Sequence, residues 1–118
     1  MPKIVSEHAE QVALVTHCHK EGIFVASFCN GFYISNKAKL YPQLGKLKRE
    51  GLLKGMPDLL IIVNNKVLFF EMKNKRGKLS NEQVHIHYLL KEMGQDVQVF
   101  YNSKDAWLYI EEQRNNVA

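Results

Sequence analysis

Two short apolar segments, separated only by Asn64-Asn65, constrain the fold of this chain more than any other feature. Residues 58–63 and 66–73 have the length of β-strands. Asparagine tolerates the positive φ angles that a two-residue hairpin turn requires. The pattern therefore predicts an antiparallel hairpin with a tight turn at the two asparagines.

The register of this hairpin brings two acidic side chains together, because a two-residue loop pairs Val63 with Lys66. Counting back from that pair places Asp58 opposite Glu71, with Cβ atoms roughly 5 Å apart. Two like charges so close destabilise a sheet unless something compensates, and a divalent cation with oxygen ligands is a natural compensator. Lys73 has the side-chain parity of Glu71. We therefore predict a two-carboxylate metal site with an ammonium group beside it.

At 118 residues, the chain is most simply one domain, residues 1–118, that is large enough to bury a core. Its 46% apolar and 24% charged residues are ordinary for a soluble globular protein. No apolar stretch is long enough to span a bilayer, and the first residues lack the apolar region of a secretory signal. We expect a cytoplasmic protein, of viral or bacterial type from its length, with Cys18 and Cys29 as free buried thiols.

Ten of the 16 lysine and arginine residues fall in two segments, six in residues 36–54 and four in residues 73–78. Such clusters can neutralise phosphates and give salt-dependent affinity for nucleic acid, although a solvated helix face and a soluble loop would look the same. The second cluster directly follows Glu71, which favours phosphate contact. The residues that we expect to bind nucleic acid are Lys46, Lys48, Arg49, Lys54, Lys75, Arg76 and Lys78.

Helices and strands surround the predicted hairpin. We expect helices at residues 7–20, 42–50, 80–93 and from 103 onward, and strands at residues 23–29 and 97–101. In the helix capped by Ser80, one apolar stripe contains Ile86, Leu89, Leu90 and Met93, and in the last helix Trp107 and Ile110 should dock on the core. The hairpin is apolar on both faces, so helices must cover both. With a parallel, right-handed strand–helix–strand unit over residues 66–101, these elements predict a three-layer α/β domain with a mixed sheet.

Three short motifs together resemble the virus-type replication-repair nuclease (VRR-NUC) domain, a family of the PD-(D/E)xK superfamily of metal-dependent nucleases. They are Gly55-Met56-Pro57-Asp58, Glu71-Met72-Lys73 and the Gly-Lys-Leu-Ser-Asn-Glu-Gln of residues 77–83. The resemblance spans about residues 6–112. It implies a restriction-endonuclease-like fold with an αβββαβ core and one extra helix before the hairpin.

The resemblance also implies a Mg²⁺- or Mn²⁺-dependent endonuclease. Its catalytic residues would be Asp58, Glu71, Lys73, Glu10 and Gln83, and the metal ligands would be Asp58, Glu71 and the backbone carbonyl of Met72. A divalent ion held there would supply Lewis acidity and lower the pKa of water, which Lys73 could orient or deprotonate. The alternative is a buried ion-pair cluster of Asp58, Glu71 and Lys73 without catalysis.

An acid from the first helix completes such sites, and Glu7 and Glu10 share one helix face. We favour Glu10, because Glu7 suits the first turn and its interaction with the helix dipole. The neighbouring Gln11 could contact the metal through water. Gln83 resembles the active-site glutamine of the family, but it can also form a capping box with Ser80, and both roles stay open.

Two histidine pairs, His17/His19 and His85/His87, invite a zinc assignment. We reject it, because residues i and i+2 of a helix do not face each other. We expect these four residues to be surface or rim histidines.

We expect the substrate to be branched or Holliday-junction DNA in DNA repair, recognised by shape and backbone contacts. A two-stranded target suggests a symmetric homodimer with two active sites. No membrane and no organic cofactor are implied. The alternatives are a non-catalytic nucleic-acid-binding module with the same fold, and a nuclease subunit that needs a partner.

Overall fold

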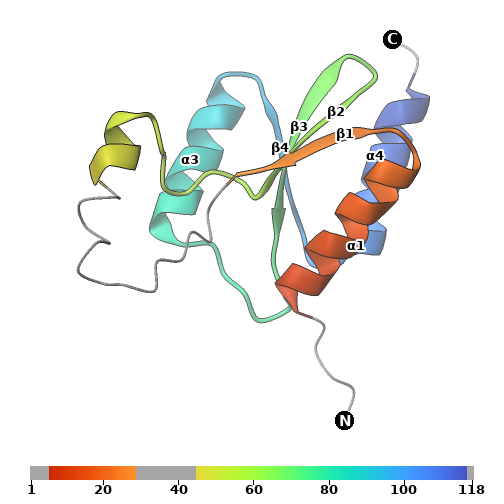
Figure 1. Cartoon of the computed structure of the whole chain (residues 1–118), viewed down its shortest axis with the longest axis horizontal. Helices are drawn as coiled ribbons and strands as arrows, with labels where there is room; N and C mark the ends of the chain where they lie inside the picture. The colour runs from red at the N-terminus through yellow and green to blue at the C-terminus, as the bar shows by residue number, and fades with distance from the viewer. Residues whose placement is uncertain (1–5, 29–44, 117–118) are drawn as a thin grey trace.

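A four-stranded mixed sheet forms the centre of the molecule (Figure 1). The structure is a computed structural model, and it describes residues 6–28 and 45–116. The strands lie in the order β1 (Phe24–Ser27), β2 (Leu59–Val63), β3 (Lys66–Met72) and β4 (Asp96–Phe100). The antiparallel pairing of β2 with β3 and the parallel pairing of β3 with β4 are as predicted, and β1 pairs antiparallel with β2. The longer helices are α1 (Glu7–Lys20), α3 (Asn81–Glu92) and α4 (Ser103–Asn115).

The hairpin turn has the predicted conformation and register. Asn64 and Asn65 have φ angles of 52° and 60°, the left-handed region that a tight turn of this kind requires. Val63 pairs with Lys66, and the β2–β3 ladder continues to the pair of Leu59 with Phe70. One further step along the ladder is the predicted pair of acidic residues.

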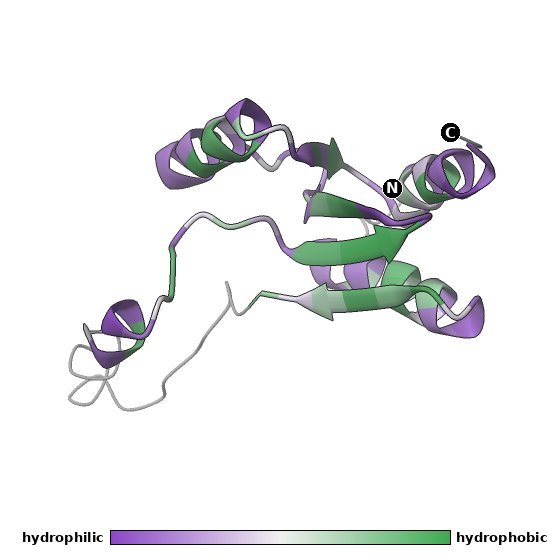
Figure 2. Cartoon of the chain, turned by 90° about the horizontal axis from the view of Figure 1, so that it is seen from above, coloured by the Kyte–Doolittle hydropathy of each residue, from purple (hydrophilic) through white to green (hydrophobic). Residues whose placement is uncertain are grey.

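Helices lie on both sides of the sheet, with α1 and α4 on one side and α3 on the other (Figure 1). The main hydrophobic core lies between the sheet and the first two of these helices. It contains Leu14 and Cys18 of α1, Ala106 and Ile110 of α4, and Leu59, Ile61, Val63, Leu68, Phe70 and Met72 of the hairpin. Trp107 packs against this core, so the predicted docking of α4 is confirmed, as is the buried free thiol of Cys18. Figure 2 shows the resulting contrast between apolar strands and helices with polar outer faces.

The α3 side of the sheet is covered less completely than we predicted. Of the predicted apolar stripe on α3, Ile86 is buried, but Met93 is 65% exposed and Leu89 is also exposed. The side chain of His87 is buried instead, at 4% exposure. On β2, Ile62 is 41% exposed, because α3 packs mainly against β4 at the far edge of the sheet.

The remaining predicted boundaries differ by a few residues. The strand expected at residues 23–29 is shorter, at Phe24–Ser27, and Cys29 lies outside the described residues. Residues 45–49 form the described part of the helix predicted at 42–50. In the part of the chain that the structure describes, no helix is long and apolar enough to cross a membrane.

Candidate active site

The two predicted carboxylates meet at the open end of the hairpin. Asp58 directly precedes β2, and its Oδ2 accepts a hydrogen bond from the backbone N–H of Met72 at 2.8 Å. Glu71 lies near the end of β3 with only 1% of its surface exposed, and its side chain hydrogen-bonds to that of Asp58. The register of the hairpin therefore places both carboxyl groups on the same side of the sheet and in contact.

The environment of Glu71 strongly favours its protonated form. Burial, the hydrogen bond with Asp58 and the negative charge of Asp58 raise the pKa of Glu71 from 4.5 to about 9, although the ammonium group of Lys73 lowers it. Without a cation, the pair reduces its repulsion by retaining a proton on Glu71. A cation between the two groups would remove the same repulsion by its own charge.

Lys73 follows β3 immediately and remains close to the two acids. Its backbone N–H donates to the carbonyl of Phe100 at 2.9 Å, which extends the pairing of β3 with β4 by one residue. Its ammonium group interacts electrostatically with Glu71, and its stem passes beside Gly77. The structure thus brings together Asp58, Glu71 and Lys73, the three residues of the predicted centre.

The first-helix acid that reaches this cluster is Glu7. Its Oε1 accepts a hydrogen bond from the backbone N–H of Asn74 at 3.3 Å, and its charge contributes to the raised pKa of Glu71. Glu10, which we favoured, points elsewhere: its Oε2 accepts from the N–H of Ser103 at 2.6 Å, at the first residue of α4. A carboxylate is stabilised at a helix N-terminus by free N–H groups and the helix dipole, so Glu10 joins α1 to α4.

Gln83 forms the predicted capping box. The N–H of Gln83 donates to Ser80 Oγ at 3.1 Å, and the N–H of Ser80 donates to Gln83 Oε1 at 2.8 Å. The side-chain oxygen of Gln83 is therefore engaged at the start of α3. The second role, at the active site, stays a prediction.

His87, which we expected to be a surface or rim residue, is buried beside the site. His87 Nε2 lies 3.2 Å from Glu71 Oε1, and both side chains are almost completely buried. Burial is the main reason why the pKa of His87 is lowered, with Lys91 and Lys73 acting in the same direction. Since the pKa of Glu71 is raised, the contact is a hydrogen bond between neutral groups rather than an ion pair.

Two glycines make room for the loops that approach the site. Gly55, three residues before Asp58, has a φ of +98°, and a Cβ there would lie 2.5 Å from the carbonyl oxygen of Glu82. The loop before β2 therefore packs directly on the first turn of α3. A Cβ on Gly77 would lie 2.9 Å from Glu7 Oε1, so the loop after β3 lies against the side chain of Glu7 in α1.

The donor set suits a small, oxygen-preferring cation. Among the described residues, no group of three or more His, Cys, Asp and Glu side chains is arranged to hold a metal ion. Mg²⁺ commonly binds through one or two carboxylates and keeps several waters, so the pair of Asp58 and Glu71 is sufficient for it. The backbone carbonyl of Met72, next to Glu71, stays the predicted third ligand. The raised pKa of Glu71 is the observation that fits a cation, because the ammonium group of Lys73 does not offset the burial of Glu71 and its repulsion by Asp58.

The predicted nucleic-acid-binding residues lie on two segments, of which one directly follows Lys73 in the sequence. Lys75, Arg76 and Lys78 are exposed on the loop that runs from β3 past the start of α1 to α3 (Figure 1). The other segment contains Lys46, Lys48, Arg49 and Lys54, all exposed. Lys54 lies 3.4 Å from Glu82, and Lys46 lies 3.9 Å from Glu50. Such exposed pairs contribute little stability, so these cations remain available to a polyanion.

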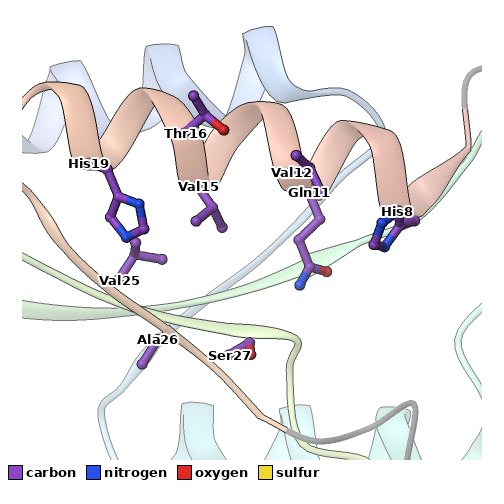
Figure 3. Close-up of a pocket in the computed structure, with 9 residues that line it drawn as sticks. All are labelled: His8, Gln11, Val12, Val15, Thr16, His19, Val25, Ala26 and Ser27. Carbon is purple, nitrogen blue, oxygen red and sulfur yellow. The ribbon is translucent and has the colours of Figure 1, made fainter. Parts of the chain in front are cut away.

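A groove of about 350 Å³ lies between α1 and β1, apart from the acidic cluster. His8, Gln11 and His19 of α1 line it together with Val25 of β1 (Figure 3). None of the residues predicted to be catalytic lines this groove. Gln11, considered above as a contact to the metal through water, points into it (Figure 3).

Comparison of the chain with protein-family models, with curated proteins and with solved structures gave no match. The function is therefore inferred from the geometry of the site and from the motifs of the sequence.

Proposed function

We propose that this chain is a metal-dependent DNA endonuclease of the VRR-NUC type, with a restriction-endonuclease-like fold. The observation that carries the proposal is the contact between Asp58 and Glu71 at the end of the hairpin, with the ammonium group of Lys73 beside them. Two acids this close, one of them buried, destabilise the metal-free protein, and a purely structural ion pair with Lys73 would not need the second acid. Divalent-cation binding gives the pair a physical reason to exist.

Each residue of the cluster has a role in phosphodiester hydrolysis. Asp58 and Glu71 would bind Mg²⁺ or Mn²⁺, which when bound supplies Lewis-acid activation of the phosphodiester and of water. Lys73 would orient the nucleophilic water or stabilise the charge that develops on the phosphoryl oxygens. Glu7, held by the N–H of Asn74, would complete the acidic side of the site.

The basic loop after β3 supports a nucleic-acid substrate. Lys75, Arg76 and Lys78 follow the site directly in sequence and are exposed, so they can bind the phosphates on either side of the scissile bond. Contacts to phosphates position a duplex without reading its sequence, which favours selection by shape, as in branched or Holliday-junction DNA. A homodimer would supply the second active site for a two-stranded target.

The test is cleavage of labelled four-way junctions, flaps and plain duplex in Mg²⁺ or Mn²⁺. We expect cleavage of a branched substrate by the wild type and a loss of at least 100-fold in Asp58→Ala and Lys73→Ala, because each removes a group that acts on the reacting phosphate. Matched controls are Glu92→Gln and Lys104→Ala, which change exposed charges of α3 and α4 and should cleave normally.

Two results would contradict the proposal. Cleavage that survives both active-site substitutions would place the activity elsewhere or in a contaminant. Gel-shift binding of the same DNA without cleavage in either metal would favour the non-catalytic binding module.

A further inference from the structure

His87 approaches the acidic pair from a different element of the fold. It lies in the middle of α3, whereas Asp58 and Glu71 belong to the hairpin. Its Nε2 is 3.2 Å from Glu71 Oε1, in a contact from which solvent is excluded. The other histidine of the pair, His85, is exposed on the same helix.

We propose that His87 is a positioning residue, which donates its Nε2–H to Glu71 Oε1 and so fixes the carboxylate for the cation that Glu71 shares with Asp58. This inference rests on the proposed function. When Glu71 binds a cation its carboxylate is ionised and only accepts hydrogen bonds, so the ring nitrogen of His87 that contacts it must carry a proton. Hydrogen bonds of this kind, made to a metal ligand from outside, typically set its orientation, and their loss lowers metal affinity.

The position of α3 is itself fixed relative to both acids. Gly55, close before Asp58, packs against the backbone of Glu82 in the first turn of α3. His87 lies five residues further along the same helix and contacts Glu71. The helix therefore touches the segments that carry both acids, and His87 makes a side-chain hydrogen bond from α3 to Glu71.

The inference is tested by titrating the 118-residue protein with Mn²⁺ and measuring the free Mn²⁺ by electron paramagnetic resonance. His87→Met has a similar volume but no donor, and we expect it to weaken Mn²⁺ binding by about 10–100-fold. His87→Gln keeps an N–H donor at the same distance from the backbone, and we expect it to bind within about threefold of the wild type. His85→Gln is the matched control on the same helix and should bind as the wild type does.

The outcomes separate this inference from the proposed function. If the wild type itself binds no Mn²⁺ at the acidic pair, the proposed function fails. If the wild type binds Mn²⁺ but His87→Met binds equally well, or if His87→Gln loses as much affinity as His87→Met, only the positioning role is overturned. Melting temperatures measured in parallel identify a purely structural role. Such a role would lower the melting temperatures of both variants without separating their Mn²⁺ affinities.

A second measurement on the wild type avoids any loss of folding in the variants. The ¹⁵N chemical shifts of the His87 ring, recorded with Mg²⁺ added, identify which ring nitrogen carries the proton. We expect a protonated Nε2 in the Mg²⁺-bound protein. An unprotonated Nε2 facing Glu71 would overturn the inference.

Discussion

Substituting Glu71 by Gln should stabilise the protein in the absence of divalent cations. The amide has the shape of the protonated carboxyl group but does not ionise, so the variant is relieved of the repulsion with Asp58. The wild type, in contrast, must either retain a proton on Glu71 or bring two negative charges together.

The sign and the size of the effect follow from the pKa of Glu71. Folding raises this pKa from 4.5 to about 9, so the folded state binds the proton more tightly than the unfolded state. The resulting stabilisation is complete below pH 4.5 and is lost as the pH rises toward 9. One proton gives a slope of at most about 1.4 kcal/mol per pH unit. With a discount for dielectric screening, we expect the wild type to lose about 2–3 kcal/mol between pH 5.5 and 8.5 relative to Glu71→Gln.

The assay is urea denaturation in EDTA at pH 5.5, 7 and 8.5, repeated in Mg²⁺. At pH 8.5 in EDTA, Glu71→Gln should unfold at a higher urea concentration than the wild type, and Glu92→Gln, an exposed acid of α3, should behave as the wild type does. Mg²⁺ should stabilise the wild type and leave Glu71→Gln unchanged, because only the ionised carboxylate is a strong ligand. Equal pH dependence of wild type and Glu71→Gln in EDTA would refute the reasoning, as would equal stabilisation of both by Mg²⁺.

Four further substitutions test the surroundings of the site and the turn at the other end of the hairpin. Gly55→Ala should destabilise the protein by about 2–4 kcal/mol in urea denaturation, because the new Cβ would overlap the first turn of α3 at an unfavourable φ, and a change below about 0.5 kcal/mol would mean that the two segments are not packed together. Glu10→Gln should cost about 1 kcal/mol of stability and leave Mn²⁺ affinity unchanged, whereas Glu7→Gln should change Mn²⁺ affinity; the reverse pattern would return the first-helix role to Glu10. Asn65→Gly should stabilise the hairpin by about 0.5–1 kcal/mol, because Asn65 has a φ of 60°, and a lower melting temperature would contradict the turn conformation.

The hairpin and its acid pair could be predicted from sequence because their determinants are local. Asn64 and Asn65 select a two-residue turn, and the two-residue period of a strand then fixes the register as far as Asp58 and Glu71.

The choice between Glu7 and Glu10 depended on contacts far apart in the sequence. Both lie on one face of α1, and the partner of Glu10 is the N-terminus of α4, 93 residues further along the chain. The helix pattern of α1 contains no information about the position of α4, so local reasoning could not separate the two acids.

His87 was misplaced for a related reason. An apolar stripe is a good guide to the buried face of a helix only where the opposing surface is apolar. Here the opposing strand contributes Glu71, and a buried carboxyl group requires a polar partner. The useful signal was the conflict between a strand that must be buried and an acid within it, which predicts a polar residue on the covering helix.

Anomalous diffraction from crystals soaked in Mn²⁺ would examine the shared cation site itself. We predict an anomalous peak in contact with carboxylate oxygens of both Asp58 and Glu71, and its loss in Asp58→Asn. A structure in which Mn²⁺ binds elsewhere, or in which the two carboxyl groups stay hydrogen-bonded to each other at saturating Mn²⁺, would contradict the proposed metal centre.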